Sequence, residues 1–211
     1  MNGIVGKCNL LFLTAINHKK ITTMTSKQKD LIYIYDSDRQ KVIMIDSETG
    51  ERVNEKDDEV TSLLKYLYEQ NRSVLLRKFA VWCTRQVNDD LKPIQKKILD
   101  LAEEAISQRA STKELQELYQ ETEGAAIATD SVGLRQGEES APAYLAAREC
   151  INPDPLEGAI QAARFHRIWT EIKLNKDGTS ALKEIKTKTE KDEISQVKQQ
   201  QTDFLLDLMN E

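Results

Sequence analysis

The sequence predicts a mainly α-helical fold: a bundle of several helices, a small β-hairpin near the N-terminus and a long helix at the C-terminus. Three observations predict it. Eight of the 211 residues are glycine and four are proline, so few positions interrupt a helix. From residue 60 onward, apolar residues recur at spacings of three and four, as on one face of a helix. Before residue 54, two short β-branched and aromatic runs are separated by turn residues.

The hairpin is predicted within residues 30–56. Its strands are the runs 31–35 and 42–45, joined by Asp-Ser-Asp-Arg-Gln, and a glycine turn follows at 47–50. A short third strand is expected near Arg52 and Val53. Because an isolated hairpin is only marginally stable in water, one of its faces must pack against the helices.

Residues 57–173 are predicted to form the helical bundle. The second helix begins near Ser73, Pro93 opens the third, and Ser111 with Glu114 makes a capping box for the fourth. An alanine-rich helix at 141–150 must end before the two prolines that follow, and Pro155 opens the next helix. The stripes expected to face the core are Val60, Leu63, Leu64, Leu67 and Tyr68, then Leu75, Leu76, Phe79, Trp82, Cys83 and Val87, then Ile94, Ile98, Leu101, Ala102 and Ala105.

Two segments are expected to break the helical pattern. The stretch 130–142 is predicted to be an internal loop, and residues 174–211 are predicted to form a hinge and a long C-terminal helix. The apolar end of that helix, at 203–209, should dock on the bundle. Alanines gather between residues 125 and 163, which favours close packing of the helices there.

Charge and cysteine content bound the function. The net charge is −5, but residues 1–29 carry five lysines and no acid, which leaves −10 on the rest of the chain. We expect this basic leader to be disordered, with Met24 as an alternative start of translation. The apolar run 10–16 is too short to span a bilayer, and the acidic body disfavours nucleic acid and membrane surfaces. Three cysteines without a C-x-x-C pair predict a cytoplasmic protein.

Two segments each place a phenylalanine one helical turn before a tryptophan. The pairs are Phe79 with Trp82 and Phe165 with Trp169. We expect both helices to lie in one bundle and to bury both tryptophans. The arginines near them are expected to pair with acids on neighbouring helices; they are Arg77, Arg85, Arg148, Arg164 and Arg167.

Several of these segments together resemble a group of helical proteins from bacteria and their phages. The resemblance rests on residues 79–87, 102–115, 162–169 and 199–206, and spans about residues 75–206. It is strongest to the immunity proteins found beside bacterial toxins and in mobile elements. The interruption at 130–140 and the hairpin have no counterpart in that pattern. The resemblance implies a non-catalytic, helical interaction protein, and it transfers no catalytic residue.

The cysteines and histidine are the remaining candidates for chemistry. Cys83, Cys150 and His166, with Glu149, could bind a metal, or a cysteine could pair with His166 as a nucleophile. Their spacing matches no standard motif, and each thiol lies on an apolar face, which favours core cysteines. The acidic turns at 36–38 and 46–48 lack the spacing of a calcium loop.

We therefore assign no catalytic, cofactor-binding or metal-binding residue and expect no cofactor. The function predicted is binding of a protein partner, as an immunity-like neutraliser or an accessory factor of a phage or mobile element. The alternative is a Cys/His-dependent or metal-dependent enzyme, which we do not favour.

Overall fold

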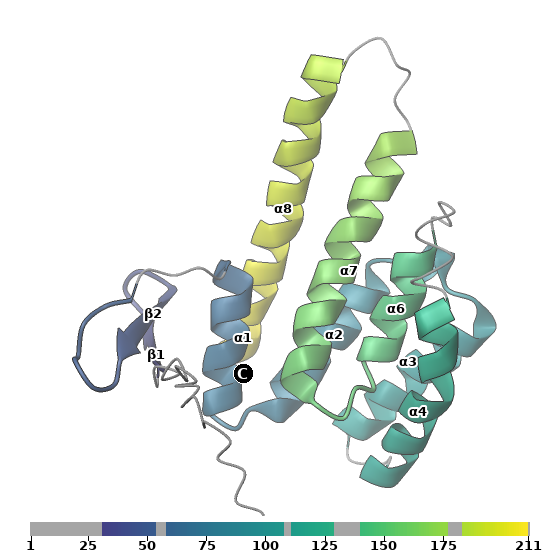
Figure 1. Cartoon of the computed structure of the whole chain (residues 1–211), viewed down its shortest axis with the longest axis horizontal. Helices are drawn as coiled ribbons and strands as arrows, with labels where there is room; N and C mark the ends of the chain where they lie inside the picture. The colour runs from purple at the N-terminus through teal and green to yellow at the C-terminus, as the bar shows by residue number, and fades with distance from the viewer. Residues whose placement is uncertain (1–30, 54–57, 108–110, 129–139, 177–182, 211) are drawn as a thin grey trace, which may run out of the picture.

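The structure, a computed structural model, describes residues 31–53, 58–107, 111–128, 140–176 and 183–210. It is a helical bundle with an N-terminal two-stranded hairpin and a long C-terminal helix, as predicted (Figure 1). The predicted leader 1–29, most of the predicted loop 130–142 and the centre of the predicted hinge lie outside the described residues.

The hairpin consists of β1 (Leu31–Asp36) and β2 (Lys41–Asp46), paired antiparallel. Ile45 makes one isolated β-bridge to Arg52, so the third strand predicted there is reduced to a single bridge and the described sheet has two strands. The two acidic turns serve the backbone: Asp36 accepts from the amides of residues 38 and 39, and Asp46 accepts from those of residues 48 and 49. These are the ordinary bonds of aspartate in turns.

The first helices are α1 (Glu59–Glu69), α2 (Ser73–Arg85), α3 (Pro93–Ile106) and α4 (Thr112–Ala128), with a short 3-10 turn at Asn88–Asp90. Asp58 caps α1 by accepting from the amide of Thr61 at 2.9 Å. The predicted capping box of α4 is present. Ser111 donates its amide to Glu114 at 2.8 Å, and its hydroxyl accepts from the Glu114 amide at 3.2 Å.

The later helices are α6 (Ala141–Glu149), α7 (Pro155–Lys176) and α8 (Lys183–Met209). α7 continues past residue 173, where the predicted bundle ends. The end of α8 docks as expected, since Leu205 and Leu208 are buried. α8 packs against α1, α2 and α7. No helix in the described part of the chain is long and apolar enough to cross a membrane.

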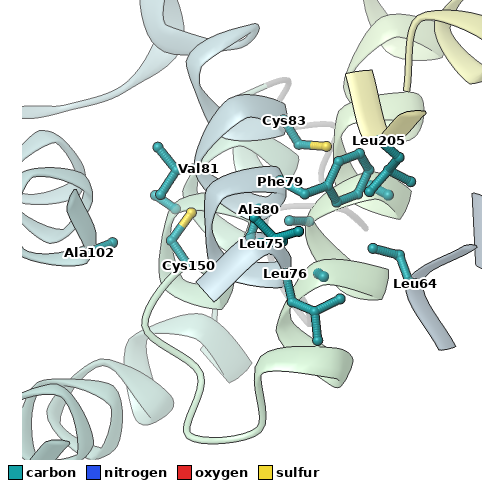
Figure 2. Packing of buried hydrophobic residues seen from close by; sticks show 14 of the residues in the cluster. Leu64, Leu75, Leu76, Phe79, Ala80, Val81, Cys83, Ala102, Cys150 and Leu205 are labelled. Atoms are coloured by element: carbon teal, nitrogen blue, oxygen red, sulfur yellow. The ribbon is translucent and has the colours of Figure 1, made fainter. Parts of the chain in front are cut away.

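α2 lies at the centre of the bundle, with α7, α3, α6, α1 and α8 around it. Figure 2 shows its Phe79 directed toward Leu205 of α8, while Cys150 lies on another side of α2. α6 and α7 pack closely through small residues, as predicted. The buried alanines on these two helices are Ala141, Ala143, Ala146, Ala147, Ala159, Ala162 and Ala163.

The predicted stripes are wrong at two positions. Tyr68 is 48% exposed at the end of α1, and Ile94 is 50% exposed in the first turn of α3. Leu99, which the predicted stripe does not include, is fully buried. Both errors fall in the terminal turns of their helices.

Gly158 lets the start of α7 approach the end of α6. A Cβ atom at this position would lie 2.5 Å from the carbonyl oxygen of Glu149 and 3.0 Å from the Cβ of Asn152. In an open helix Gly→Ala would stabilise by up to about 1 kcal/mol. Here we expect Gly158→Ala to lower the free energy of unfolding by about 1–3 kcal/mol, because the backbone of α6 must move. Urea denaturation measures it, and a stabilised variant would contradict the close approach.

Candidate functional site

Gln201 of α8 is the centre of a buried polar cluster at the junction of α1, α2, α7 and α8. Its side chain is fully buried. The amide oxygen accepts from Arg167 Nε at 2.7 Å, and the amide nitrogen donates to the carbonyl of Ala163 at 3.1 Å. The same nitrogen lies 3.4 Å from His166 Nδ1 and 3.9 Å from Cys83 Sγ. One side chain thus contacts both predicted candidates, Cys83 and His166.

Arg167 extends this cluster to α1. Its Nη1 donates to the carboxylate of Asp58, the residue that caps α1. Burial alone would raise the pKa of Asp58, but bonds from Thr61 and the charge of Arg167 lower it overall. Since Arg167 also holds Gln201, it links the start of α1 to α7 and α8.

His166 is buried in this cluster. Its ring meets the ring of Trp82 edge-on, with centroids 6.0 Å apart. Burial, followed by the charge of Arg167, lowers the pKa of His166 to about 4. The imidazole is therefore neutral at pH 7, and its conjugate acid is too strong for efficient general acid–base catalysis at that pH.

The two cysteines are held as neutral thiols. Cys83 is fully buried, and burial, together with nearby Cys150, raises its pKa well above the ordinary value. Burial also raises the pKa of Cys150 to about 12. Cys150 Sγ lies 3.1 Å from the hydroxyl of Thr84 in α2. Since the thiolate is the nucleophile and the metal ligand, these environments suppress both activities.

Glu149 belongs to a separate group at the end of α6. Its carboxylate contacts Arg148 at 2.9 Å and the amide of Asn152 at 2.6 Å, and burial raises its pKa. Arg148 in turn lies over the ring of Tyr119 in α4. Within the described residues, no group of three or more His, Cys, Asp or Glu side chains is arranged to hold a metal ion. The proposed four-residue site is therefore not assembled.

The expectation that these arginines pair with acids on neighbouring helices holds for two of the five. Arg85 contacts Glu103 of α3 at 2.6 Å, and Arg167 contacts Asp58. Arg148 pairs with the adjacent Glu149, Arg77 donates to the carbonyl of Cys150, and Arg164 donates to Gln161 in its own helix. These contacts tie helices together or stabilise single helices.

The two tryptophan-bearing helices pack against each other, as predicted, but the tryptophans are only partly buried. Trp82 stacks on Phe204 of α8 at 4.6 Å between centroids. Trp169 donates its indole N–H to Asp90 at 2.6 Å. The buried side of α7 is made instead by its alanines and His166, because small residues permit the closer approach to α2 and α6.

Replacing either thiol should affect stability alone. We expect Cys83→Ala and Cys150→Ala each to lower the free energy of unfolding by about 1–2 kcal/mol through a small cavity. Iodoacetamide at pH 8 should label neither thiol in the folded protein and both after unfolding. Rapid labelling of Cys83 or Cys150 in the folded protein, located by peptide mass spectrometry to distinguish it from labelling of Cys8, would contradict the structural role, as would stoichiometric zinc after purification without added metal.

The outer face of the hairpin is a feature that the sequence interpretation missed. The inner face packs on α1: Tyr35 meets Tyr66 of α1 at 5.9 Å between ring centroids, and Val42 and Met44 are buried. The opposite side carries two directly opposed isoleucine pairs. We call this side the isoleucine face; it consists of Ile32, Ile34, Ile43 and Ile45.

The isoleucine face remains accessible to solvent. Ile32 is 46% exposed and Ile34 is 44% exposed, while Ile43 and Ile45 are partly buried. A signal for it exists in the sequence. Both strands are continuously apolar, whereas a hairpin with one solvated face alternates apolar and polar residues. No protein-family model, curated protein or solved structure matches this chain.

Proposed function

We propose that this protein is a non-catalytic helical domain that binds another protein through the isoleucine face of its hairpin. The exposure of Ile32 and Ile34 on a surface made of four isoleucines carries the proposal. Scattered exposed apolar residues are ordinary, whereas Ile32 and Ile34 lie together on one sheet face with two further isoleucines opposite them.

The energetics indicate an anchor rather than a complete interface. Burying the exposed part of a half-exposed isoleucine contributes about 1 kcal/mol. Only Ile32 and Ile34 are half-exposed, so the four isoleucines together supply less than about 4 kcal/mol, which is the low end of what association costs in lost freedom. The partner must therefore make further contacts around the isoleucine face.

The buried candidates for chemistry support a binding role. The thiols of Cys83 and Cys150 are protonated, and His166 is neutral with a weakly basic imidazole. The Gln201 amide nitrogen lies 3.4 Å from His166 Nδ1 and 3.9 Å from Cys83 Sγ, so a neutral amide contacts both side chains. The resemblance to immunity proteins makes a bacterial toxin the class of partner to test first.

Affinity capture tests this proposal with a matched pair of variants. Ile34→Lys places a charge on the isoleucine face, and Ile94→Lys makes the same change at a similarly exposed position of α3. Since both sites are at the surface, each should change stability by about 1 kcal/mol or less. We expect Ile34→Lys to lose the captured partner and Ile94→Lys to retain it. Equal retention by both variants would contradict the proposal.

A further inference from the structure

We propose that the occupant of the isoleucine face is an amphipathic α-helix of the partner, with an apolar stripe bordered by acidic residues. It would lie on the outer face of the hairpin as α1 lies on the inner face. The inference rests on the proposed function and specifies the class of partner segment.

The composition of the strands supports a helix on both sides. The inner residues Tyr33, Tyr35, Val42 and Met44 face α1, and the outer side carries the four isoleucines, with the Asp36–Lys41 pair at its end. Continuous apolar strands are typical of sheets that are covered on both faces, usually by helices. Figure 1 shows the hairpin at the outside of the bundle, with α1 on the bundle side. A second helix would complete a three-layer arrangement of helix, hairpin and helix.

The isoleucine face has the dimensions of a single helix, and on its own it is too small for a stable dimer of this chain. Two strands of six residues form a surface roughly 20 Å long and 10 Å wide. One helix is about 10–12 Å in diameter, and about 13 residues cover 20 Å. The area, roughly 200 Å², is far below the approximately 800 Å² that each partner buries in a typical stable dimer.

Cationic residues at the edge of the isoleucine face favour acidic residues beside the apolar stripe of the partner helix. Side chains alternate along a strand, so Lys41 lies on the same side of β2 as Ile43 and Ile45. Arg52 is bridged to Ile45 and therefore shares that side. Both cations are exposed. Asp36, opposite Lys41, turns its carboxylate to the amides of its own turn and lies 3.7 Å from Arg39 Nε. The accessible margin along β2 is thus cationic and complements acidic residues.

Photo-crosslinking identifies the occupant. A benzoylphenylalanine at position 34 of the full chain, expressed in its source cells, should crosslink a foreign protein that the same label at position 94 does not. Mass spectrometry of the crosslinked peptide should show apolar residues at helical spacing with Asp or Glu beside them. The isolated partner should then lose at least tenfold in affinity for the double variant Lys41→Glu and Arg52→Glu, with Lys96→Glu and Lys97→Glu as the charge-matched control.

Other outcomes overturn the inference in distinguishable ways. A foreign segment with strand-like alternation or basic borders would refute the helix but leave the proposed function intact. Equal affinity loss in the two double variants would refute the charge complementarity alone. Crosslinks confined to a second copy, or to residues 1–30 of the same chain, would refute both the inference and the proposed function.

Discussion

Phe79→Ala is expected to lower the free energy of unfolding by about 3–5 kcal/mol, the largest effect of any single substitution we propose. Phe79 is fully buried in the central helix α2. Its ring contacts Trp82 and Phe204, with centroids 6.2 and 6.5 Å away, so its removal leaves a cavity between α2 and α8. Against a typical total stability of about 5–15 kcal/mol, this loss threatens the fold.

Chemical denaturation monitored by circular dichroism measures this loss. Phe165→Ala is the matched control, because Phe165 is only partly buried in α7 and should cost clearly less. Phe79→Leu keeps most of the volume and should recover the greater part of the stability. A loss below about 1 kcal/mol for Phe79→Ala would show that α2 is not the centre of the core.

The second large effect is a loss of stability in mild acid through His166. Its pKa is about 4 in the folded protein and about 6.5 when unfolded. Between these values the unfolded chain takes up a proton that the folded chain does not. The contribution of His166 to stability should therefore be constant above about pH 7 and fall as the pH drops from 6.5 toward 4. The total is about 3 kcal/mol, at about 1.4 kcal/mol per pH unit.

A variant isolates the contribution of His166 from those of other groups. The raised pKa of Glu149 acts in the opposite direction, because its stabilising effect is lost as the pH rises. The lowered pKa of Asp58 acts mainly below pH 4. His166→Asn keeps an acceptor for Gln201 but does not titrate. The difference between wild type and this variant should carry the slope between pH 6.5 and 4, and a flat difference would contradict the buried, neutral histidine.

The helices could be predicted because their signals are local. Pro93 and Pro155 mark helix starts through their fixed φ, and the Ser111–Glu114 box marks one through bonds within its own turn; the structure has all three. The hairpin strands follow from β-branched runs between turn residues. The errors in the predicted core lie where packing against another element decides which side chain is buried. Ile94 matches the helical period, but its side chain in the first turn of α3 is exposed, which the period alone does not show.

The polar cluster could not be predicted because its members come from distant segments. In the sequence, Gln201 is one of several glutamines in a polar helix. Nothing in the neighbouring residues indicates that it contacts Arg167, His166 and Cys83. The isoleucine face, by contrast, could have been inferred from the sequence. Its two apolar runs lack the alternation expected of a hairpin with one wet face, and only the packing of α1 shows which side is covered.

Our central proposal is that this protein binds its partner through the isoleucine face and that Cys83, Cys150 and His166 stabilise the fold. Quantitative capture of the partner by two multiple variants tests it most directly. Circular dichroism must first show both to be folded. We expect the variant with Ile32→Ser and Ile34→Ser to lose the partner, and the variant with Cys83→Ala, Cys150→Ala and His166→Asn to retain it. Loss of binding in the second variant with retention in the first would contradict the claim.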